Sequence, residues 1–311
     1  MRLVFMGTPD FAVPSLKALL NSGHEIAGVV TQPDRPRGRG KKLQPPPVKE
    51  TALAAGLPVS QPAAMKEEEF LTRLQQWQPE VIVVVAFGRI LPQEILDLPE
   101  KGCINLHASL LPRYRGAAPI HRAVMNGEKE TGVTTMWMVP QLDAGDIILQ
   151  EKLPIGPDAT TGEIHDRLAI LGAELLVHTL DLVATGRAPR QPQDDALATY
   201  APPLQPDEEK INWERPAGKI YNLIRGLNPW PGAYTLRAGE RLKVYGARIL
   251  DEATTGVPGQ VVAVTSEGFV VQAGRGKLLI TTVQPQGKKI MPADAYLRGY
   301  PLATGEVLGC A

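Results

Sequence analysis

The strongest constraint on the fold is a run of five apolar residues, Val81 to Val85, with no polar position in it. A strand with one face in water alternates apolar and polar residues, whereas a parallel strand covered by helices on both faces is apolar throughout. Other candidate strands at Leu3–Met6, Ile26–Thr31, Cys103–Ala108 and Gly132–Val139 alternate with segments of helical spacing. The pattern predicts an α/β fold with a doubly wound, mostly parallel, Rossmann-like sheet.

The character of the sequence changes near residue 188. Residues 188–206 are polar and proline-containing, which is typical of a linker. Beyond them, one short helix near 216–226 is followed by short strands separated by glycine turns, a spacing that predicts a small antiparallel, OB-like β-barrel. We therefore expect an α/β domain over 1–187, a linker over 188–206 and a C-terminal barrel over 207–311.

Several classes of protein are disfavoured by composition. The two cysteines, Cys103 and Cys310, are too few for a disulfide framework or a four-ligand zinc site, and the five histidines lack metal-binding spacing. We expect a cytoplasmic protein without a metal. The longest apolar run, Val81–Phe87, is far shorter than the roughly 20 residues that span a bilayer, so no membrane association is expected.

Positive charge is concentrated although the net charge is zero. Residues 31–50 carry six basic and two acidic residues, and residues 206–311 carry 13 basic and 10 acidic. The loop 31–47 is also rich in glycine and proline, and we expect it to lack regular structure, to be mobile when free and to bind phosphates.

Polar residues mark the carboxyl end of one predicted strand. Cys103, Asn105 and His107 are two residues apart, so their side chains share one face. Asn and His are poor strand formers, and ligands of such sheets bind at the carboxyl ends, so the pair indicates a site. A core histidine with a turn-forming asparagine is the structural alternative. Asp143 and Asp146 are both candidates for the partner carboxylate, and Cys103 fits a buried core position better than a nucleophile.

The turn after the first strand, Gly7-Thr8-Pro9, lacks the dinucleotide fingerprint, because the next glycine is Gly23. Without closely spaced glycines the backbone cannot approach a pyrophosphate, which argues against an NAD- or FAD-dependent oxidoreductase.

With these residues in view, the chain resembles the 10-formyltetrahydrofolate-dependent formyltransferases, and within that family the branch that acts on tRNA. The matching segments extend over nearly the whole chain: Gly7–Ala12, Thr31–Lys42, Asn105–His107, Ser109–Arg113, Leu142–Asp146, Asn228–Pro231 and Gln284–Lys289. The segment from Asn105 to Arg113 and the Asp143 segment are common to the whole family. They indicate the chemistry, whereas the basic loop and the C-terminal barrel resemble the tRNA branch.

The resemblance implies roles for particular residues. Asn105 would donate a hydrogen bond to the oxyanion, His107 would stabilise that charge and move protons, and Asp143 would orient His107. The folate formyl donor would be bound by Phe87, Gly88, Ile90, Leu91, Ser109, Leu110, Leu111 and Pro112, with Val139–Asp143 closing the pocket. Initiator methionyl-tRNA would be bound by Arg35, Arg37, Arg39, Lys41, Lys42, Lys288 and Lys289. No metal and no obligate protein partner are expected.

Other acceptors and other activities fit parts of the sequence. A small amine such as a sugar nucleotide is an alternative acceptor, because a basic loop also suits a nucleotide diphosphate. The separate C-terminal domain favours a larger partner. A non-catalytic RNA-binding module is disfavoured by the joint presence of Asn105, His107 and Asp143.

Overall fold

A computed structural model describes residues 1–37, 42–250, 253 and 255–309. The predicted tRNA contacts Arg39 and Lys41, and also Cys310, lie outside the described residues. The chain forms two compact units. The first unit contains 1–119, 130–154 and 165–202, and the second contains 120–129, 155–164 and 203–311.

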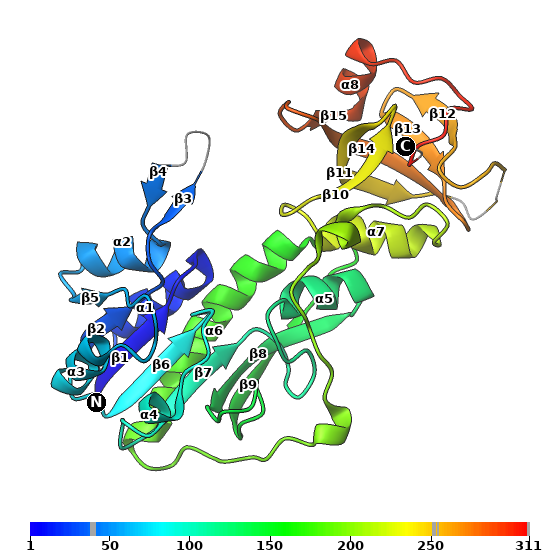
Figure 1. Cartoon of the computed structure of the whole chain (residues 1–311). Helices are drawn as coiled ribbons and strands as arrows, with labels where there is room; N and C mark the ends of the chain where they lie inside the picture. The colour runs from blue at the N-terminus through cyan, green and yellow to red at the C-terminus, as the bar shows by residue number, and fades with distance from the viewer. Residues whose placement is uncertain (38–41, 251–252, 254, 310–311) are drawn as a thin grey trace. The chain divides into compact units, whose positions relative to one another are not determined.

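The first unit is built on a mixed sheet of seven strands (Figure 1), which confirms the predicted, mostly parallel α/β fold. In spatial order the strands are β5 (Val59–Ser60), β2 (Glu25–Val30), β1 (Arg2–Gly7), β6 (Val81–Val85), β7 (Cys103–His107), β8 (Glu130–Trp137) and β9 (Ile147–Pro154). The pairs from β5 to β7 are parallel, and β8 and β9 add antiparallel strands. The order reverses between β1 and β6, which is where sheets of this kind bind ligands.

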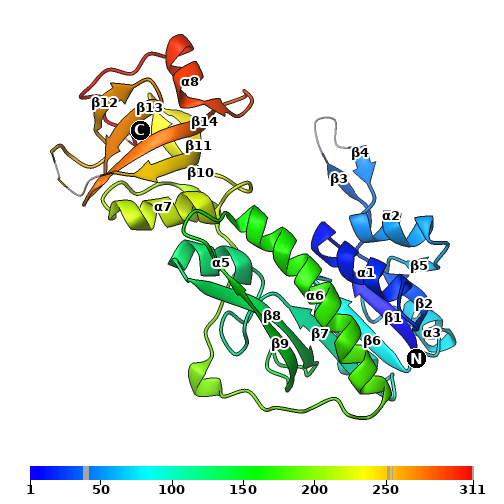
Figure 2. The same cartoon turned by 180° about the vertical axis from the view of Figure 1, so that it is seen from behind.

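Helices cover both faces of this sheet. Phe70 of α3 (Glu68–Gln76) and Ile95 of α4 (Gln93–Leu96) pack in one cluster with Val4 and Ile82. Figure 2 shows α6 (Thr161–Ala184) along the sheet, where its Thr179 hydroxyl lies 2.8 Å from that of Thr135 in β8. None of the described helices combines the length and the apolar character needed to cross a bilayer.

The first helix begins beyond Asp10. Asp10–Ala12 form a 3-10 turn, and the helix α1 spans Val13–Leu20. Pro14 then lies in the first turn of α1, where its missing N–H costs nothing because those donors have no intrahelical partner.

The expectation that loop 31–47 lacks regular structure is wrong. Strand β3 (Arg35–Arg37) pairs antiparallel with β4 (Lys42–Gln44), and helix α2 (Pro47–Ala54) begins on the last proline of the segment. Both strands of a two-stranded ribbon are edge strands, where Pro36 is tolerated, and a proline at the first helical position is already preset for the helix.

The second unit contains the predicted antiparallel sheet. Its strands are β10 (Ala233–Arg237), β11 (Glu240–Ile249), β12 (Val261–Thr265), β13 (Gly268–Gln272), β14 (Lys277–Pro285) and β15 (Met291–Pro292). They run in the order β10–β11–β14–β13–β12, with β15 on β14. Helices α7 (Ala217–Gly226) and α8 (Ala293–Gly299) pack on its core, which includes Trp213 and Phe269. Helix α5 (Pro119–Asn126) and the first residues of α6 also belong to this unit.

The segment interpreted as a linker is bonded to the first unit over much of its length. We call residues 189–201 the strap; it contains one 3-10 turn, Asp195–Leu197. The backbones of Gln191 and Ile147 exchange two hydrogen bonds. The Arg115 N–H donates to the Thr199 carbonyl at 2.8 Å, and the Ala201 N–H donates to the Arg115 carbonyl at 2.7 Å. The strap is therefore a fixed part of the surface that surrounds the carboxyl end of β7.

Candidate active site

The carboxyl end of β7 presents two polar side chains on one face of the sheet. Cys103, on that same face, packs into the apolar cluster under the sheet, and Asn105 and His107 follow it toward the end of the strand. His107 is 7% exposed, whereas Asn105 is half-buried and its amide has no hydrogen-bond partner among the described residues. An amide that the protein leaves unsatisfied at a strand end is available to a ligand.

The imidazole of His107 is fixed by a backbone carbonyl. Its Nε2 lies 2.9 Å from the carbonyl oxygen of Tyr114. A carbonyl can only accept, so the proton of the neutral ring lies on Nε2 and the lone pair lies on Nδ1. That Nδ1 atom is 3.6 Å from Oδ2 of Asp143. The ring can therefore take up a proton at Nδ1, between itself and the carboxylate.

Asp143 is placed by an unusual backbone conformation. Its φ of 49° lies in the left-handed region, which non-glycine residues rarely adopt, although Asp tolerates it better than most. Its Oδ2 accepts a hydrogen bond from the Gly116 N–H at 2.8 Å. Asp146, the other candidate, lies at the base of β9, where its carbonyl accepts from the Trp137 N–H. The structure thus brings Asp143, and not Asp146, to His107.

The loop after β7 is held from the side by the antiparallel strand β8. The Thr134 hydroxyl donates to the Ser109 carbonyl at 2.7 Å and accepts from the Leu111 N–H at 3.2 Å. Ser109 is buried, and its hydroxyl donates to the Arg113 carbonyl at 2.6 Å. The hydroxyl and the carbonyl of Ser109 are therefore both engaged within the protein, where they fix the shape of the loop.

A second group of polar atoms lies at the strand-order reversal, and two of its members, Thr8 and Gln32, were not among the predicted site residues. Gln32, after β2, donates from Nε2 to the Phe87 carbonyl at 2.9 Å and accepts from Arg35 at 2.6 Å through Oε1. Thr8, after β1, donates to the same Phe87 carbonyl at 3.1 Å. A Cβ on Gly88, where φ is 76°, would meet Gln32 Nε2 at 2.6 Å, so this approach requires glycine. Their positions directly after two parallel strands are the sequence signal for them.

The predicted folate residues include both buried and exposed side chains. Phe87 and Leu91 are buried in one apolar cluster and Leu111 in another, whereas the Ile90 side chain is 80% exposed. Leu142 is also exposed, directly before Asp143. Exposed apolar side chains beside backbone polar groups suit a flat, hydrogen-bonding ring system such as a pterin.

The thiol of Cys103 is unsuited to nucleophilic chemistry. It is 3% exposed, and its Sγ lies 3.7 Å from the Ile95 carbonyl oxygen. Burial raises the pKa of the Cys103 thiol to about 12, so the thiol stays protonated at neutral pH. This favours the core interpretation of Cys103.

The predicted tRNA contacts occur in both units. Arg35 is exposed on the β3–β4 ribbon, and Arg37 and Lys42 occupy directly opposite positions of its ladder. Lys288 and Lys289 are exposed in the turn between β14 and β15. Lys49, counted with the basic loop, instead forms an ion pair with Asp34 at 2.8 Å.

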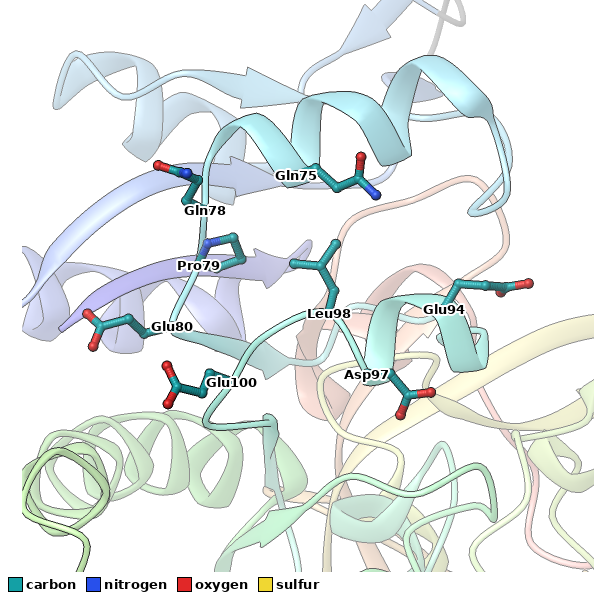
Figure 3. A pocket seen from close by; sticks show the side chains of 8 residues that line it. All are labelled: Gln75, Gln78, Pro79, Glu80, Glu94, Asp97, Leu98 and Glu100. Atoms are coloured by element: carbon teal, nitrogen blue, oxygen red, sulfur yellow. The ribbon is translucent and has the colours of Figure 1, made fainter.

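A cavity of about 560 Å³ lies away from these residues, at the amino ends of β6 and β7 (Figure 3). Four of its lining residues are acidic, and none is basic: Glu80, Glu94, Asp97 and Glu100. Such a lining repels phosphate groups, so the cavity does not suit a tRNA backbone.

Comparison with known proteins identifies the family. Residues 1–180 match the family described as formyl transferase, and residues 203–301 match the formyl transferase C-terminal domain. The chain belongs to the formyl transferase family. It is 77% identical over 310 residues to the methionyl-tRNA formyltransferase of Moorella thermoacetica, with 100% of both chains covered.

Two solved structures share the fold at low identity. HypX from Aquifex aeolicus, in complex with tetrahydrofolic acid, is similar with a TM-score of 0.65 and 18% identity over 98% of this chain. This chain spans about half of that protein, 48%. An N-formyltransferase from Helicobacter canadensis, in complex with folinic acid and dTDP-3-aminofucose, gives a TM-score of 0.67 at 19% identity, covering 90% of this chain and 99% of the other.

Proposed function

We propose that this chain transfers the formyl group of 10-formyltetrahydrofolate to the α-amine of initiator methionyl-tRNA, giving N-formylmethionyl-tRNA for translation initiation. The observation that carries the proposal is the full-length 77% identity to a methionyl-tRNA formyltransferase, which includes both the catalytic and the C-terminal family regions. The reaction belongs to the cytoplasm, and tRNA and folate are the partners it requires.

Asn105 donates a hydrogen bond to the formyl oxygen as negative charge develops on it. In support, the Asn105 amide is half-buried and has no partner among the described residues, so no internal bond must break first. A preorganised donor of this kind contributes roughly 3–4 kcal/mol to transition-state stabilisation in comparable sites.

His107 and Asp143 together take the proton that the amine loses when it forms the new bond to the formyl carbon. The Nε2–H of His107 is already engaged by Tyr114, so the incoming proton binds at Nδ1, where the Asp143 carboxylate at 3.6 Å stabilises the imidazolium. No covalent formyl-enzyme is needed, in keeping with the buried, protonated thiol of Cys103.

The amine adds to the formyl carbon to give a tetrahedral intermediate; the bond from that carbon to N10 of the folate then breaks, and N10 leaves with the proton that His107 returns to it. Apolar groups at Phe87, Leu91 and Leu111 and the backbone of the Ser109–Pro112 loop bind the folate ring system, with Ile90 and Leu142 covering it. The basic ribbon and the Lys288–Lys289 turn bind tRNA phosphates through charge rather than base reading. We retain 1–187, 188–206 and 207–311 as the proposed catalytic domain, connection and tRNA-binding domain.

The proposal is tested by incubating the full chain with 10-formyltetrahydrofolate and one of two acceptors, charged initiator tRNA or an amino-sugar nucleotide, while tetrahydrofolate release is followed. We expect release that depends on the charged tRNA. Turnover with the sugar nucleotide alone would transfer the assignment to small-amine formylation, the activity class suggested by the Helicobacter canadensis structure. No turnover with either acceptor would overturn the proposal.

A further inference from the structure

The side chain of Gln193 connects the two loops that place the His107–Asp143 pair. Its Nε2 donates to the Asp143 carbonyl at 2.9 Å and to the Gly145 carbonyl at 2.7 Å. Its Oε1 accepts from Arg115, at 3.1 Å from Nε and 2.8 Å from Nη2. Both donor hydrogens and both lone pairs of this amide are therefore used inside the protein.

Both loops carry a residue in the left-handed region, and both are held by the strap. Asp143 has a φ of 49° and is bound at its carbonyl by Gln193, while Tyr114 has a φ of 61° and is bound at its N–H by the Thr199 hydroxyl at 2.9 Å. Such conformations persist only where surrounding contacts fix them. The strap supplies those contacts at the two residues that touch His107.

Arg115 links Gln193 to the segment that holds the Asp143 carboxylate. Its guanidinium is on a residue only 4% exposed, and it is paired with Asp195 at 2.8 Å as well as with Gln193. The next residue, Gly116, donates the N–H that binds the Asp143 carboxylate. Gln193 thus binds both the backbone of Asp143 and the segment that holds the Asp143 carboxylate.

We propose that Gln193 is a positioning residue for the reaction: it fixes the turn at Asp143 so that the carboxylate stays beside Nδ1 of His107. This inference rests on the proposed function, because it assigns Gln193 an effect on formyl transfer. Gln193 itself touches neither the imidazole nor the carboxylate oxygens, and it acts through Asp143.

The first test compares Gln193→Leu with Gln191→Leu in the full chain. Gln191 lies on the same strap, its side chain is exposed and has no hydrogen bond to the described residues, and its backbone pairing with Ile147 survives the change. We expect Gln193→Leu to lower kcat by about tenfold to a hundredfold, the scale of an ångström-sized misplacement of a reacting group, with a smaller change in KM for the folate donor. Gln191→Leu should stay within about twofold of wild type.

A double-mutant cycle separates positioning from general stability. If Gln193 acts through Asp143, adding Gln193→Leu to Asp143→Asn should lower kcat by less than about threefold beyond the single Asp143→Asn change. Multiplied effects, or an unchanged kcat in Gln193→Leu, would overturn the positioning role. Inactivity of the wild-type chain would instead overturn the proposed function.

A second variant keeps the test decisive if Gln193→Leu fails to fold, as judged by its thermal melting. Gln193→Glu retains an acceptor for Arg115 but places a carboxylate oxygen against the Asp143 and Gly145 carbonyls. We expect a kcat loss at least as large as that of Gln193→Leu, with the fold preserved. Wild-type kcat in Gln193→Glu would show that the two donated hydrogen bonds do not position Asp143.

Discussion

The strap (189–201) and the β3–β4 ribbon (35–44) are two polar, proline-containing segments whose polar groups find their hydrogen-bond partners in different places. The strap directs Gln193 and Thr199 inward, onto the loops that hold His107 and Asp143. The ribbon pairs its backbone with itself and places Arg37 directly opposite Lys42. The segment 31–50 around the ribbon carries six basic and two acidic residues.

The difference indicates what each segment is for. A segment whose polar groups are satisfied within the protein sets geometry, and its loss should change turnover. A segment rich in positive charge is expected to gain favourable interactions from a polyanion, so its loss should change the use of that partner and the salt dependence. The two kinds of effect can be separated by measuring kcat, KM for tRNA and donor affinity in the same variants.

The largest effects are expected at Asn105 and His107, the two polar residues at the end of β7. Asn105→Ala and His107→Ala should each lower turnover by about two to three orders of magnitude, because one removes the oxyanion donor and the other the proton acceptor. Steady-state assays with charged tRNA measure the loss, and folate binding serves as the control. Near-normal turnover in either variant with intact folate binding would contradict the assigned roles.

The ribbon should produce the next largest effect, confined to tRNA. Arg37→Ala combined with Lys42→Ala should lower kcat/KM for methionyl-tRNA by about tenfold to a hundredfold and reduce the slope of log affinity against log salt by about 2. The matched control removes two positive charges elsewhere, as Lys17→Ala with Arg187→Ala. A parallel loss of donor affinity would place the ribbon in the folate site instead, and no change would make it an ordinary solvated loop.

The sequence was sufficient to predict how the β7 residues of the site are arranged, but not to place Asp143 beside them. The period of two along Cys103–His107 predicts correctly that Asn105 and His107 share a face, because strand geometry alone sets it. The choice of Asp143 over Asp146 came from the family resemblance. The position of Asp143 depends on hydrogen bonds to Gly116, 27 residues away, and to Gln193, 50 residues away, which local sequence does not reveal. The ribbon was missed because prolines argue against strands in general but not against edge strands.

The turn between β14 and β15 extends the comparison to the second unit. Lys288→Ala with Lys289→Ala should raise KM for methionyl-tRNA by about threefold to tenfold, which is less than the effect of the ribbon variant. The reason is that Lys288 and Lys289 form an exposed pair, whereas Arg37 and Lys42 belong to a segment, 31–50, that contains four further basic residues. kcat at saturating tRNA and donor affinity should be unchanged. An effect on kcat as large as that on KM would mean that the turn orders the site rather than holds phosphates.

The smallest effect on activity is expected at Cys103, on the same strand face as Asn105 and His107. In a Cys310→Ser background, the native Cys103 thiol should resist a thiol reagent at pH 8, because burial raises its pKa to about 12. Cys103→Ala should keep kcat within about twofold while lowering the free energy of unfolding by about 1 kcal/mol through the lost packing.

Since the folded thiol has a pKa above its ordinary value of 9.0, its stabilising contribution is complete below pH 9 and is lost as the pH rises toward 12. Unfolding measured from pH 8 to 11 should therefore show a steeper loss of stability with Cys103 than with alanine. Rapid labelling of the folded protein, or a tenfold loss of kcat in the alanine variant, would return Cys103 to the list of reacting groups.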